Sequence, residues 1–318
     1  MKDSGLILKE DDGRTTAAQE AEQRLFSYYG LDYTVEFIKL HESNHRIRIL
    51  RIGNGKPVMM VPGGVGDAWI FGALLSHLSG YQLIIVNRPG GGLSDGIDHR
   101  LINMPQFAAS TLAMVLNHCG VERAPIICNS IGGRWGFWFA KECKERVSAI
   151  IQLGAPALIL GTGAPLAMRL LSVPLLNRLL VKKMIPANLE KARQLPMFLG
   201  HPKEVGINWP EAEVECSYYF PRLPTFKVSW LSLLESVMSL QGTRAGMDLG
   251  EDDLRCVEQP VAFIWGKNDP FANLEVAQRT QKLVPKAELH KVGIGHHPWW
   301  DAPAECGALC RDFLSREA

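Results

Sequence analysis

Three residue types that can work together as nucleophile, acid and base occur in separate stretches of the chain. The stretches are Cys128–Gly133, Gly266–Pro270 and Gly293–Trp299, which hold Ser130, Asp269 and His296 in that order. A serine hydroxyl is a poor nucleophile at neutral pH and needs a base to take its proton. An imidazole does this when a carboxylate fixes its tautomer and stabilises its cation. Because one enzyme architecture uses the chain order Ser, Asp, His, the pattern predicts attack by Ser130 on a carbonyl carbon.

Each of these assignments has an alternative within the same sequence. Ser130 and Asp269 are residue types that also begin helices. His297 adjoins His296, but it fills the variable position of the pattern Gly-x-Gly-His-x-Pro, which favours His296 as the base. Asp301 is a second candidate for the carboxylate. It follows His296 so closely in the sequence that bracing of the loop is its more natural role.

Two backbone amides are candidates for binding the negative charge that forms on the attacked carbonyl oxygen. A tetrahedral intermediate needs at least two donors aimed at this oxygen. The amide of Ile131, directly after the nucleophile, is one such donor. Gly64 follows the apolar run 58–61 and supplies the other, because a side chain at this position would crowd the substrate. An ordinary glycine turn is the alternative interpretation of Gly64.

Short apolar runs alternate with helical patterns and predict the elements that must position these residues. Such runs are typical of parallel strands buried on both faces of a sheet. Strands are predicted at 58–61, 83–86, 126–128, 149–153, 261–265 and 287–292, after two half-buried strands at 33–40 and 46–52. Helices are predicted at 17–29, 67–79, 104–119, 131–145 and 303–316. Alternation of this kind predicts an α/β fold with a parallel sheet between two layers of helices.

The alternation stops after Gly154 and returns at Val261. Residues 155–245 are rich in Leu and Met, and six prolines between Pro165 and Pro210 separate their helical segments. We therefore predict a core formed by residues 1–154 and 246–318, with an inserted helical subdomain at 155–245.

The composition excludes several classes of function. A net charge of +1 over 318 residues gives no electrostatic reason to expect binding to nucleic acid or to an acidic membrane. The most apolar stretch, 155–181, is broken by Pro165 and Pro174 and carries Arg169 and Arg178, which makes it a poor membrane span. The N-terminal residues lack the pattern of a signal peptide. The seven cysteines are scattered and odd in number, which predicts reduced thiols and a cytoplasmic location.

No cofactor or metal is expected. The glycine-rich stretch 87–95 lacks the Gly-Lys-Ser/Thr ending of a phosphate-binding loop and does not open into a helix as a dinucleotide-binding motif does. Cys306 and Cys310 have helical spacing but no matching second pair of ligands, so buried thiols are the better interpretation. No pattern in the sequence sets the oligomeric state.

Together the motifs resemble the α/β-hydrolase fold with a helical cap. They are Arg-Pro-Gly-x-Gly-x-Ser-Asp at 88–95, small-x-Ser-x-Gly at 128–132, Trp-Gly-x-x-Asp-Pro at 265–270 and Gly-x-Gly-His-x-Pro-Trp at 293–299. The resemblance implies a mostly parallel central sheet with helices on both faces and residues 155–245 as the cap. It also implies Ser130 as nucleophile, His296 as base, Asp269 as its partner, and Gly64 with Ile131 as the oxyanion hole. Two positions depart from the pattern, with Pro62 where many members have His and Cys128 where they have Gly.

The residue at the nucleophile position limits the reaction. Haloalkane dehalogenases and epoxide hydrolases of similar layout need a carboxylate there, whereas this chain has Ser130. Serine with an oxyanion hole predicts hydrolysis of a carboxylic ester, lactone or thioester through an acyl-enzyme. The first alternative is hydrolysis of a carbon–carbon bond in a vinylogous diketone, because the stretch Asn129–Gly133 resembles the elbow of those hydrolases. They tend to have Trp after the base, where this chain has His297. Perhydrolysis and a catalytically silent binding protein are further alternatives.

The helical insertion is expected to select the substrate. Leucines between Leu170 and Leu180 and the segment 230–238 form apolar stripes at helical spacing, most of which must pack on the core. A cap lies over the strand ends, so some of these side chains should line the pocket. Trp230 and Leu231 are the candidates, and the expected partner is a mainly apolar small molecule.

Overall fold

The computed structural model describes residues 7–40, 45–64, 66–162 and 164–317. Within this described part, eight strands form one sheet in the order β1-β2-β4-β3-β5-β6-β9-β10. The strands are β1 (Tyr33–Lys39), β2 (Arg46–Ile52), β3 (Lys56–Val61), β4 (Tyr81–Asn87), β5 (Ala124–Asn129), β6 (Val147–Leu153), β9 (Val261–Trp265) and β10 (Ala287–Lys291). The pairs β1–β2 and β2–β4 are antiparallel, and the other neighbours run parallel. The predicted strands and the mostly parallel sheet are confirmed.

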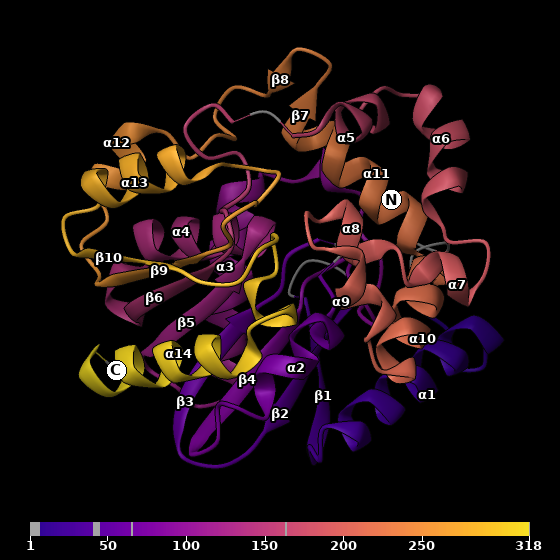
Figure 1. Cartoon of the computed structure of the whole chain (residues 1–318), viewed down its shortest axis with the longest axis horizontal. Helices are drawn as coiled ribbons and strands as arrows, with labels where there is room; N and C mark the ends of the chain where they lie inside the picture. The colour runs from indigo at the N-terminus through magenta and orange to yellow at the C-terminus, as the bar shows by residue number, and fades with distance from the viewer. Residues whose placement is uncertain (1–6, 41–44, 65, 163, 318) are drawn as a thin grey trace.

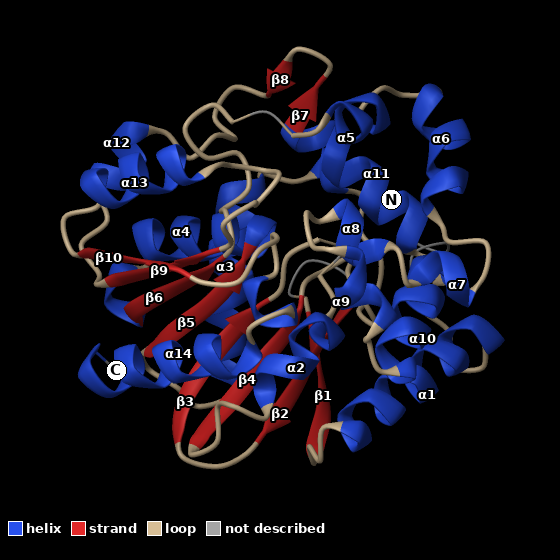
Figure 2. Ribbon diagram, viewed as in Figure 1, coloured by secondary structure: helices blue, strands red, loops and turns tan. Residues whose placement is uncertain are grey.

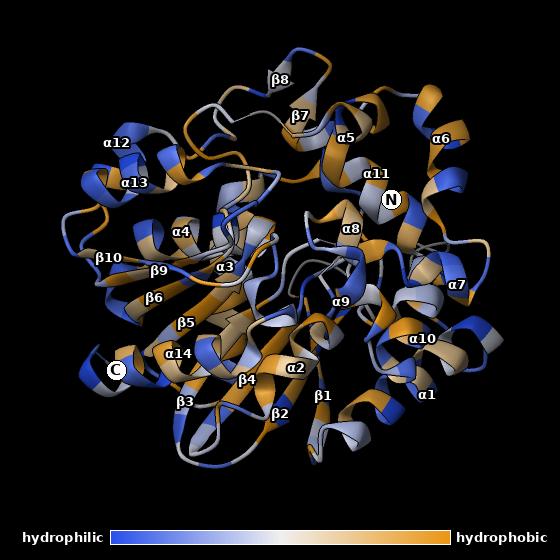
Figure 3. Ribbon diagram, in the orientation of Figure 1, coloured by the Kyte–Doolittle hydropathy of each residue, from blue (hydrophilic) through white to orange (hydrophobic). Residues whose placement is uncertain are grey.

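Helices cover both faces of this sheet (Figures 1 and 2). Helices α3 (Met104–His118) and α4 (Ser130–Glu142) pack together on one face, and α2 (Gly72–Leu75) packs against α14 (Pro303–Glu317) on the other. Helices α12 (Glu251–Arg255) and α13 (Leu274–Leu283) flank β9 and β10. Central strands such as β5 carry fully buried side chains along their whole length, which matches the hydrophobic colour in Figure 3.

Helices dominate the stretch between β6 and β9, and prolines set where several of them begin. The elements are α5 (Leu166–Leu171), α6 (Leu176–Met184), α7 (Leu189–Ala192), α8 (Leu195–Phe198), α9 (Lys203–Ile207), α10 (Glu211–Tyr219), α11 (Phe226–Val237) and a short hairpin of β7 (Met238–Ser239) and β8 (Gly242–Thr243). Pro165, Pro202 and Pro210 directly precede α5, α9 and α10, where a fixed φ suits the start of a helix. In Figure 1 these elements lie beside the carboxyl ends of the parallel strands.

Three sequence-based expectations differ from the structure. The helix predicted at 67–79 is a 3₁₀ turn (η1, Ala68–Phe71) followed by the short α2, because burial of its aromatic side chains overrides the helical pattern. The first helix, α1 (Gly13–Tyr28), begins four residues before the predicted start, since Asp12 caps it by accepting a hydrogen bond from the Arg14 amide. Leu175, which directly precedes α6, and Leu179, which lies within α6, are exposed instead of packing on the core.

Two buried carboxyl groups tie α1 to the rest of the fold. Glu22 is fully buried and binds the guanidinium of Arg48 on β2 through two hydrogen bonds of 3.1 and 2.5 Å. Tyr29 donates its hydroxyl to Glu213 of α10 at 2.6 Å. Burial raises the pKa of Glu213 to about 7, although the Tyr29 hydrogen bond works against this. Helix α1 therefore bridges the sheet and the segment inserted after β6.

No helix within the described ranges combines the length and apolar character needed to cross a bilayer.

Removing the partner of Glu22 tests how far this bridge stabilises the fold. Arg48→Met keeps the length of the side chain but leaves a buried carboxylate without its cation. We expect the free energy of unfolding to fall by about 3–5 kcal/mol. Chemical denaturation measures this change. Arg14→Met, which breaks the exposed pair with Asp12, is the matched control and should leave the free energy of unfolding almost unchanged. Equal losses in the two variants would contradict the role given to the buried pair.

Candidate active site

Ser130 lies at the sharp turn where β5 ends and α4 begins. Its φ is +51°, in the left-handed region that non-glycine residues seldom adopt. The turn closes because its neighbours lack side chains: a Cβ on Gly132 would overlap the carbonyl oxygen of Val61, and one on Gly133 would overlap the side-chain oxygen of Gln152. This strained turn places the hydroxyl of Ser130 beyond the carboxyl end of β5, where the residue lines a cavity.

Cys128 is accommodated where a glycine is usual in such turns. Its thiol is fully buried and contacts the side-chain oxygen of Gln152 at 3.4 Å. Burial raises the pKa of this thiol. The side chain is therefore an inert part of the core in the described structure.

Asp269 and His296 meet beyond the ends of β9 and β10. His296 Nδ1 lies 2.8 Å from Asp269 Oδ2, and both side chains are almost completely buried. The backbone amides of Ala155 and Phe271 also donate to the carboxylate, at 2.8 and 2.9 Å. Burial acts to raise the pKa of Asp269, but the charge and hydrogen bond of His296 and the two amides outweigh it and hold the pKa below its usual value. The carboxylate is thus ionised and fixed on the Nδ1 side of the imidazole.

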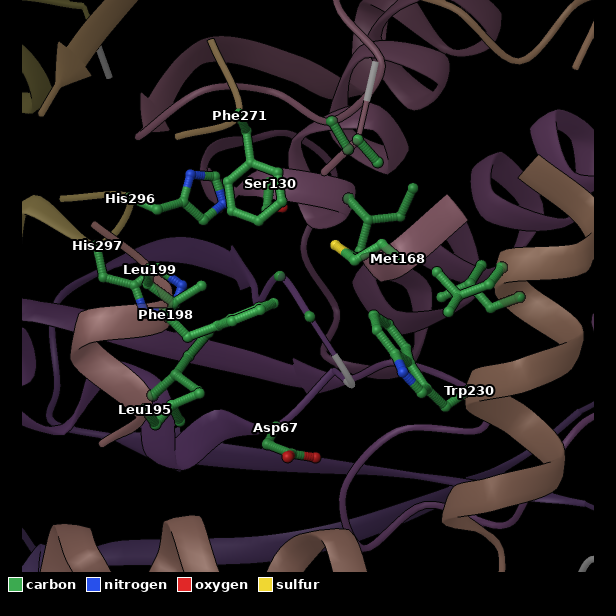
Figure 4. A pocket seen from close by; sticks show the side chains of 18 of the residues that line it. Asp67, Ser130, Met168, Leu195, Phe198, Leu199, Trp230, Phe271, His296 and His297 are labelled. Carbon is green, nitrogen blue, oxygen red and sulfur yellow. The ribbon is translucent and has the colours of Figure 1, made fainter. Parts of the chain in front are cut away.

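The other ring nitrogen of His296 faces the cavity that Ser130 also lines. His296 Nε2 is buried and has no hydrogen-bond partner among the described residues, and Ser130 Oγ does not yet bond to it in this structure. Catalytic hydrogen bonds are often long before substrate binds. Phe271 lies over the imidazole with 4.3 Å between ring centroids (Figure 4). An unpartnered, shielded nitrogen beside a serine is suited to accept a proton.

His297 and Asp301, the alternative candidates for base and carboxylate, take other positions. The His297 ring stacks on Trp299 and meets Trp300 edge-on, with centroids 4.7 and 4.2 Å apart. Burial first, and then the nearby charges of His296 and His201, lower the pKa of His297 well below its usual value. Asp301 accepts hydrogen bonds from the Ile294 amide and from His201 Nδ1. The structure therefore pairs Asp269 with His296, while Asp301 braces the loop before it.

Gly64 and Ile131, the two expected amide donors, both line the cavity beside Ser130. Gly64 has a φ of +50°, and a side chain there would meet nothing within 4 Å. Free space thus exists next to its backbone, as a bound carbonyl oxygen requires.

Arg88 holds the loop that carries Gly64. Its buried guanidinium donates to the carbonyl oxygens of Pro62 at 2.9 Å, Gly63 at 3.4 Å and Gly64 at 2.6 Å. Because C=O and N–H of a trans peptide point in opposite directions, the amide of Gly64 is turned away from Arg88. Burial lowers the pKa of Arg88 to about 10, an effect that nearby Asp67 opposes, so the group stays charged at neutral pH. The sequence motif at 88–95 marks this arginine, but its three carbonyl partners are visible only in the fold.

A short piece of the inserted segment supports the loop of His296. The carbonyl of Leu199 accepts a hydrogen bond from the His296 amide at 2.8 Å. His201 Nε2 accepts one from the His297 amide at 3.3 Å, and His201 Nδ1 lies 2.9 Å from Asp301 Oδ2. His201 thus links the insertion to both ends of the loop. Nothing in the sequence pattern indicated this residue.

The cavity has a volume of about 220 Å³ and a mostly apolar wall. Besides Ser130, His296 and the two amide donors, apolar side chains from the insertion dominate the lining, among them Met168, Leu195, Phe198, Leu199, Phe226, Trp230, Leu233 and Leu234. Trp230 lies in this wall, as expected. Leu231 is buried but lies outside the lining, because the next residue along a helix points about 100° away. No Lys or Arg lines the cavity within the described ranges.

The chain matches known proteins along most of its length. The model of the alpha/beta hydrolase fold family matches residues 56–303. The chain is 26% identical over 295 residues to a 2-hydroxy-6-oxononadienedioate/2-hydroxy-6-oxononatrienedioate hydrolase of Paraburkholderia phymatum, covering 89% of this chain and 96% of that protein. It is 24% identical over 299 residues to a 2-hydroxy-6-oxo-6-phenylhexa-2,4-dienoate hydrolase of Burkholderia cepacia, with coverage of 89% and 96%.

Solved structures agree in fold. Naproxen esterase (carboxylesterase NP) of Bacillus subtilis superposes with a TM-score of 0.70 at 14% identity, covering 96% of this chain and 99% of that one. Since the family model spans most of the chain and includes the turns that carry Ser130, Asp269 and His296, the chain belongs to the α/β-hydrolase superfamily.

Proposed function

We propose that the chain is a serine hydrolase in which Ser130, His296 and Asp269 form the catalytic triad. One observation carries this proposal: the buried Asp269–His296 pair presents an unpartnered Nε2 to the same cavity that Ser130, on its strained turn, also lines. The proposed roles follow from this geometry. His296 takes the proton of Ser130 as the oxygen attacks a carbonyl carbon, and Asp269 stabilises the imidazolium.

We assign stabilisation of the negative charge on the carbonyl oxygen to the backbone amides of Gly64 and Ile131. Two fixed donors in a cavity shielded from water stabilise this charge far better than they would in bulk solvent. Residues 155–245 act as a cap in this proposal, because their side chains supply most of the wall around the reacting group. The substrate class that fits the wall is a small molecule with a mainly apolar body.

The relatives favour a carbon–carbon bond as the bond that is cleaved. A compound such as 2-hydroxy-6-oxo-6-phenylhexa-2,4-dienoate contains no ester, so its hydrolysis must break a bond beside the ketone. We infer the same reaction class for this chain. The proton taken by His296 passes to the carbon that leaves as the carbon–carbon bond breaks, and a water deprotonated by His296 then cleaves the acyl ester on Ser130 and restores the serine hydroxyl. This inference replaces ester hydrolysis, the first expectation from the sequence, as the leading candidate.

Ester hydrolysis is kept as a second candidate because of the charge of the cavity. The dienoate and dienedioate named for the relatives carry one or two carboxylates. The described lining offers no Lys or Arg to pair with them, and it contains the carboxyl group of Asp67. A buried anion without a partner costs several kcal/mol. A neutral ester or a neutral diketone avoids this cost.

Ser130→Ala removes the proposed nucleophile without disturbing the core. Turnover should fall by roughly 10⁴–10⁶, measured as initial rates on whichever substrate the wild type accepts. Ser315→Ala on the surface of α14 is the control and should keep the wild-type rate. Near-normal turnover by the Ser130 variant, with its circular dichroism unchanged, would rule Ser130 out as nucleophile.

Matched substrates separate the two reaction classes. We expect kcat/KM for a neutral vinylogous diketone, which keeps the phenyl ketone of 2-hydroxy-6-oxo-6-phenylhexa-2,4-dienoate but lacks its carboxylate, to exceed that for p-nitrophenyl esters of two to eight carbons by at least about tenfold, a difference of about 1.4 kcal/mol in transition-state stabilisation. Absorbance at the diketone and nitrophenolate bands gives both rates. Hydrolysis of the esters alone would identify an esterase, and inertness toward both classes would favour a silent binding protein.

His201 should position the base without touching the substrate. His201→Ala removes the acceptor of the His297 amide and the partner of Asp301, so kcat should fall by about 10- to 100-fold with little change in KM. His201→Gln places an oxygen near the position of Nε2 and should restore most of the loss, whereas His201→Asn, which reaches only toward Asp301, should not. Wild-type kcat in the alanine variant would show that the loop of His296 keeps its position without His201.

A further inference from the structure

Helix α6 lies at the surface of the inserted segment and leaves apolar side chains uncovered (Figures 1 and 3). Its inner face holds the buried residues Asn177 and Val181, and Asn177 donates to Glu235 of α11 at 2.6 Å. On the outer side Leu179 is 68% exposed, and Leu175, directly before the helix, is 71% exposed. Apolar side chains that gather on one exposed face mark a site of interaction.

Three cations share this outer side. Arg178, Lys182 and Lys183 are exposed, and within the described ranges their side chains form no ion pair or hydrogen bond. Residues three and four positions apart lie on the same side of a helix, so Lys182 and Lys183 follow Leu179 on one surface. Glu235, the acidic residue that α6 contacts, is already bound by Arg100 at 3.2 Å. We call this surface the α6 face, formed by Leu175, Leu176, Arg178, Leu179, Lys182 and Lys183.

The balanced charge of the whole chain hides this basic surface. Residues 155–188 contain four basic residues and no acidic one, although the net charge of all 318 residues is only +1. Ion pairs with acidic neighbours hold surface lysines elsewhere, for example Lys141 with Asp253 and Lys144 with Glu258. The cations of the α6 face therefore remain available to an external anion.

The α6 face lies next to an opening of the cavity that Ser130 lines. Met184, the last residue of α6, and Phe198 of α8 both line this cavity, yet they are 38% and 46% exposed. Lining residues that also reach the outside mark the rim of a cavity. Leu179 precedes Met184 by about 7.5 Å along the helix axis. Whatever covers the α6 face therefore also lies beside this rim.

Exposed leucines next to unpaired lysines suit the surface of a bilayer that contains anionic lipids. The apolar side chains of an interfacial helix enter the boundary between headgroups and acyl chains, and lysine stems extend along it toward the phosphates. A two-fold contact with a second copy would instead place the same cations of both protomers together. Residues 155–188 offer no acidic side chain to separate them. The charge pattern therefore favours lipid over self-association.

We propose that the α6 face docks on the surface of an anionic bilayer and places the cavity rim at Met184 and Phe198 against the lipid. The docking is peripheral, because α6 lies along the surface and does not cross it. Leu175, Leu176 and Leu179 supply the apolar contact, and the three cations supply the electrostatic one. This inference goes beyond the proposed hydrolase activity, since the contact needs none of the triad residues.

Co-sedimentation of the full chain with large unilamellar vesicles tests the docking. We expect the partition coefficient for phosphatidylcholine vesicles with roughly 30% phosphatidylserine to exceed that for pure phosphatidylcholine by at least about tenfold. Most of this excess should disappear when the salt concentration rises from about 0.05 M to about 0.5 M, because salt screens exposed charges. Equal partitioning into the two kinds of vesicle would overturn the proposal.

Paired variants locate the contact on the α6 face. Lys182→Gln with Lys183→Gln should lower partitioning into the anionic vesicles by about 10- to 30-fold. Lys282→Gln with Lys286→Gln is the matched control. It removes the same charge from exposed positions in and just after α13, which lies across the molecule from α6 in Figure 1, and should keep the parental value. Equal losses in the two double variants would contradict the assignment.

The apolar contact has its own pair of variants. Leu179→Ser should weaken partitioning by about fivefold, because less apolar surface enters the interface. Val35→Ser, on the edge strand β1 and also exposed, should not. Circular dichroism confirms that each variant is folded. Unchanged partitioning of the Leu179 variant would rule out insertion of this face.

Two further measurements separate this inference from its competitors. Ser130→Ala should bind vesicles as tightly as the parent, so the docking can stand even if the proposed hydrolase activity fails. Sedimentation velocity without lipid reports self-association. A dimer that Leu179→Ser dissociates, in a protein that binds no vesicles, would assign the α6 face to a second copy and overturn the proposal.

Discussion

The hydrogen bond between Asp269 and His296 is the interaction on which the site depends. It joins turns that follow two neighbouring strands, β9 and β10, and it is buried where water cannot compete. Two backbone amides, from Ala155 and Phe271, complete the shell of the carboxylate. The imidazole is thereby left with one free nitrogen, and the parallel order of the sheet brings β5 and Ser130 to the same edge. The chemistry we propose needs no further charged group at the reacting end.

The segment inserted after β6 does more than cover this edge. Leu199 and His201 hold the backbone of the loop that carries His296, so the insertion is part of the framework that positions this imidazole. Its far side is tied to α1 through Tyr29 and Glu213. The same segment supplies most of the apolar wall and Trp230. In the proposed mechanism, substrate selection and positioning of the base are therefore linked through one piece of chain.

The sequence predicts most of the sheet because buried parallel strands are continuous apolar runs, and the strand ends carry the Ser130, Asp269 and His296 motifs. Prediction from sequence fails where tertiary contacts decide which local structure forms. The pattern at 67–79 predicts one helix, but aromatic burial produces a 3₁₀ turn and a short helix. Within the insertion, the apolar pattern predicts that both Trp230 and Leu231 line the pocket. The rotation of α11 directs only Trp230 into the cavity. His201 carries no local signal, since its role arises from residues far away in the chain.

Covalent labelling of the nucleophile tests the central claim most directly. A fluorophosphonate reacts with a serine only when a base activates it, so intact-mass kinetics and peptide mapping report both the residue and its activation. The account predicts a single adduct on Ser130, formed at least about 100-fold more slowly in His296→Ala and at a comparable rate in His297→Phe. An adduct on another residue, or a labelling rate that is unaffected by loss of His296, would contradict it.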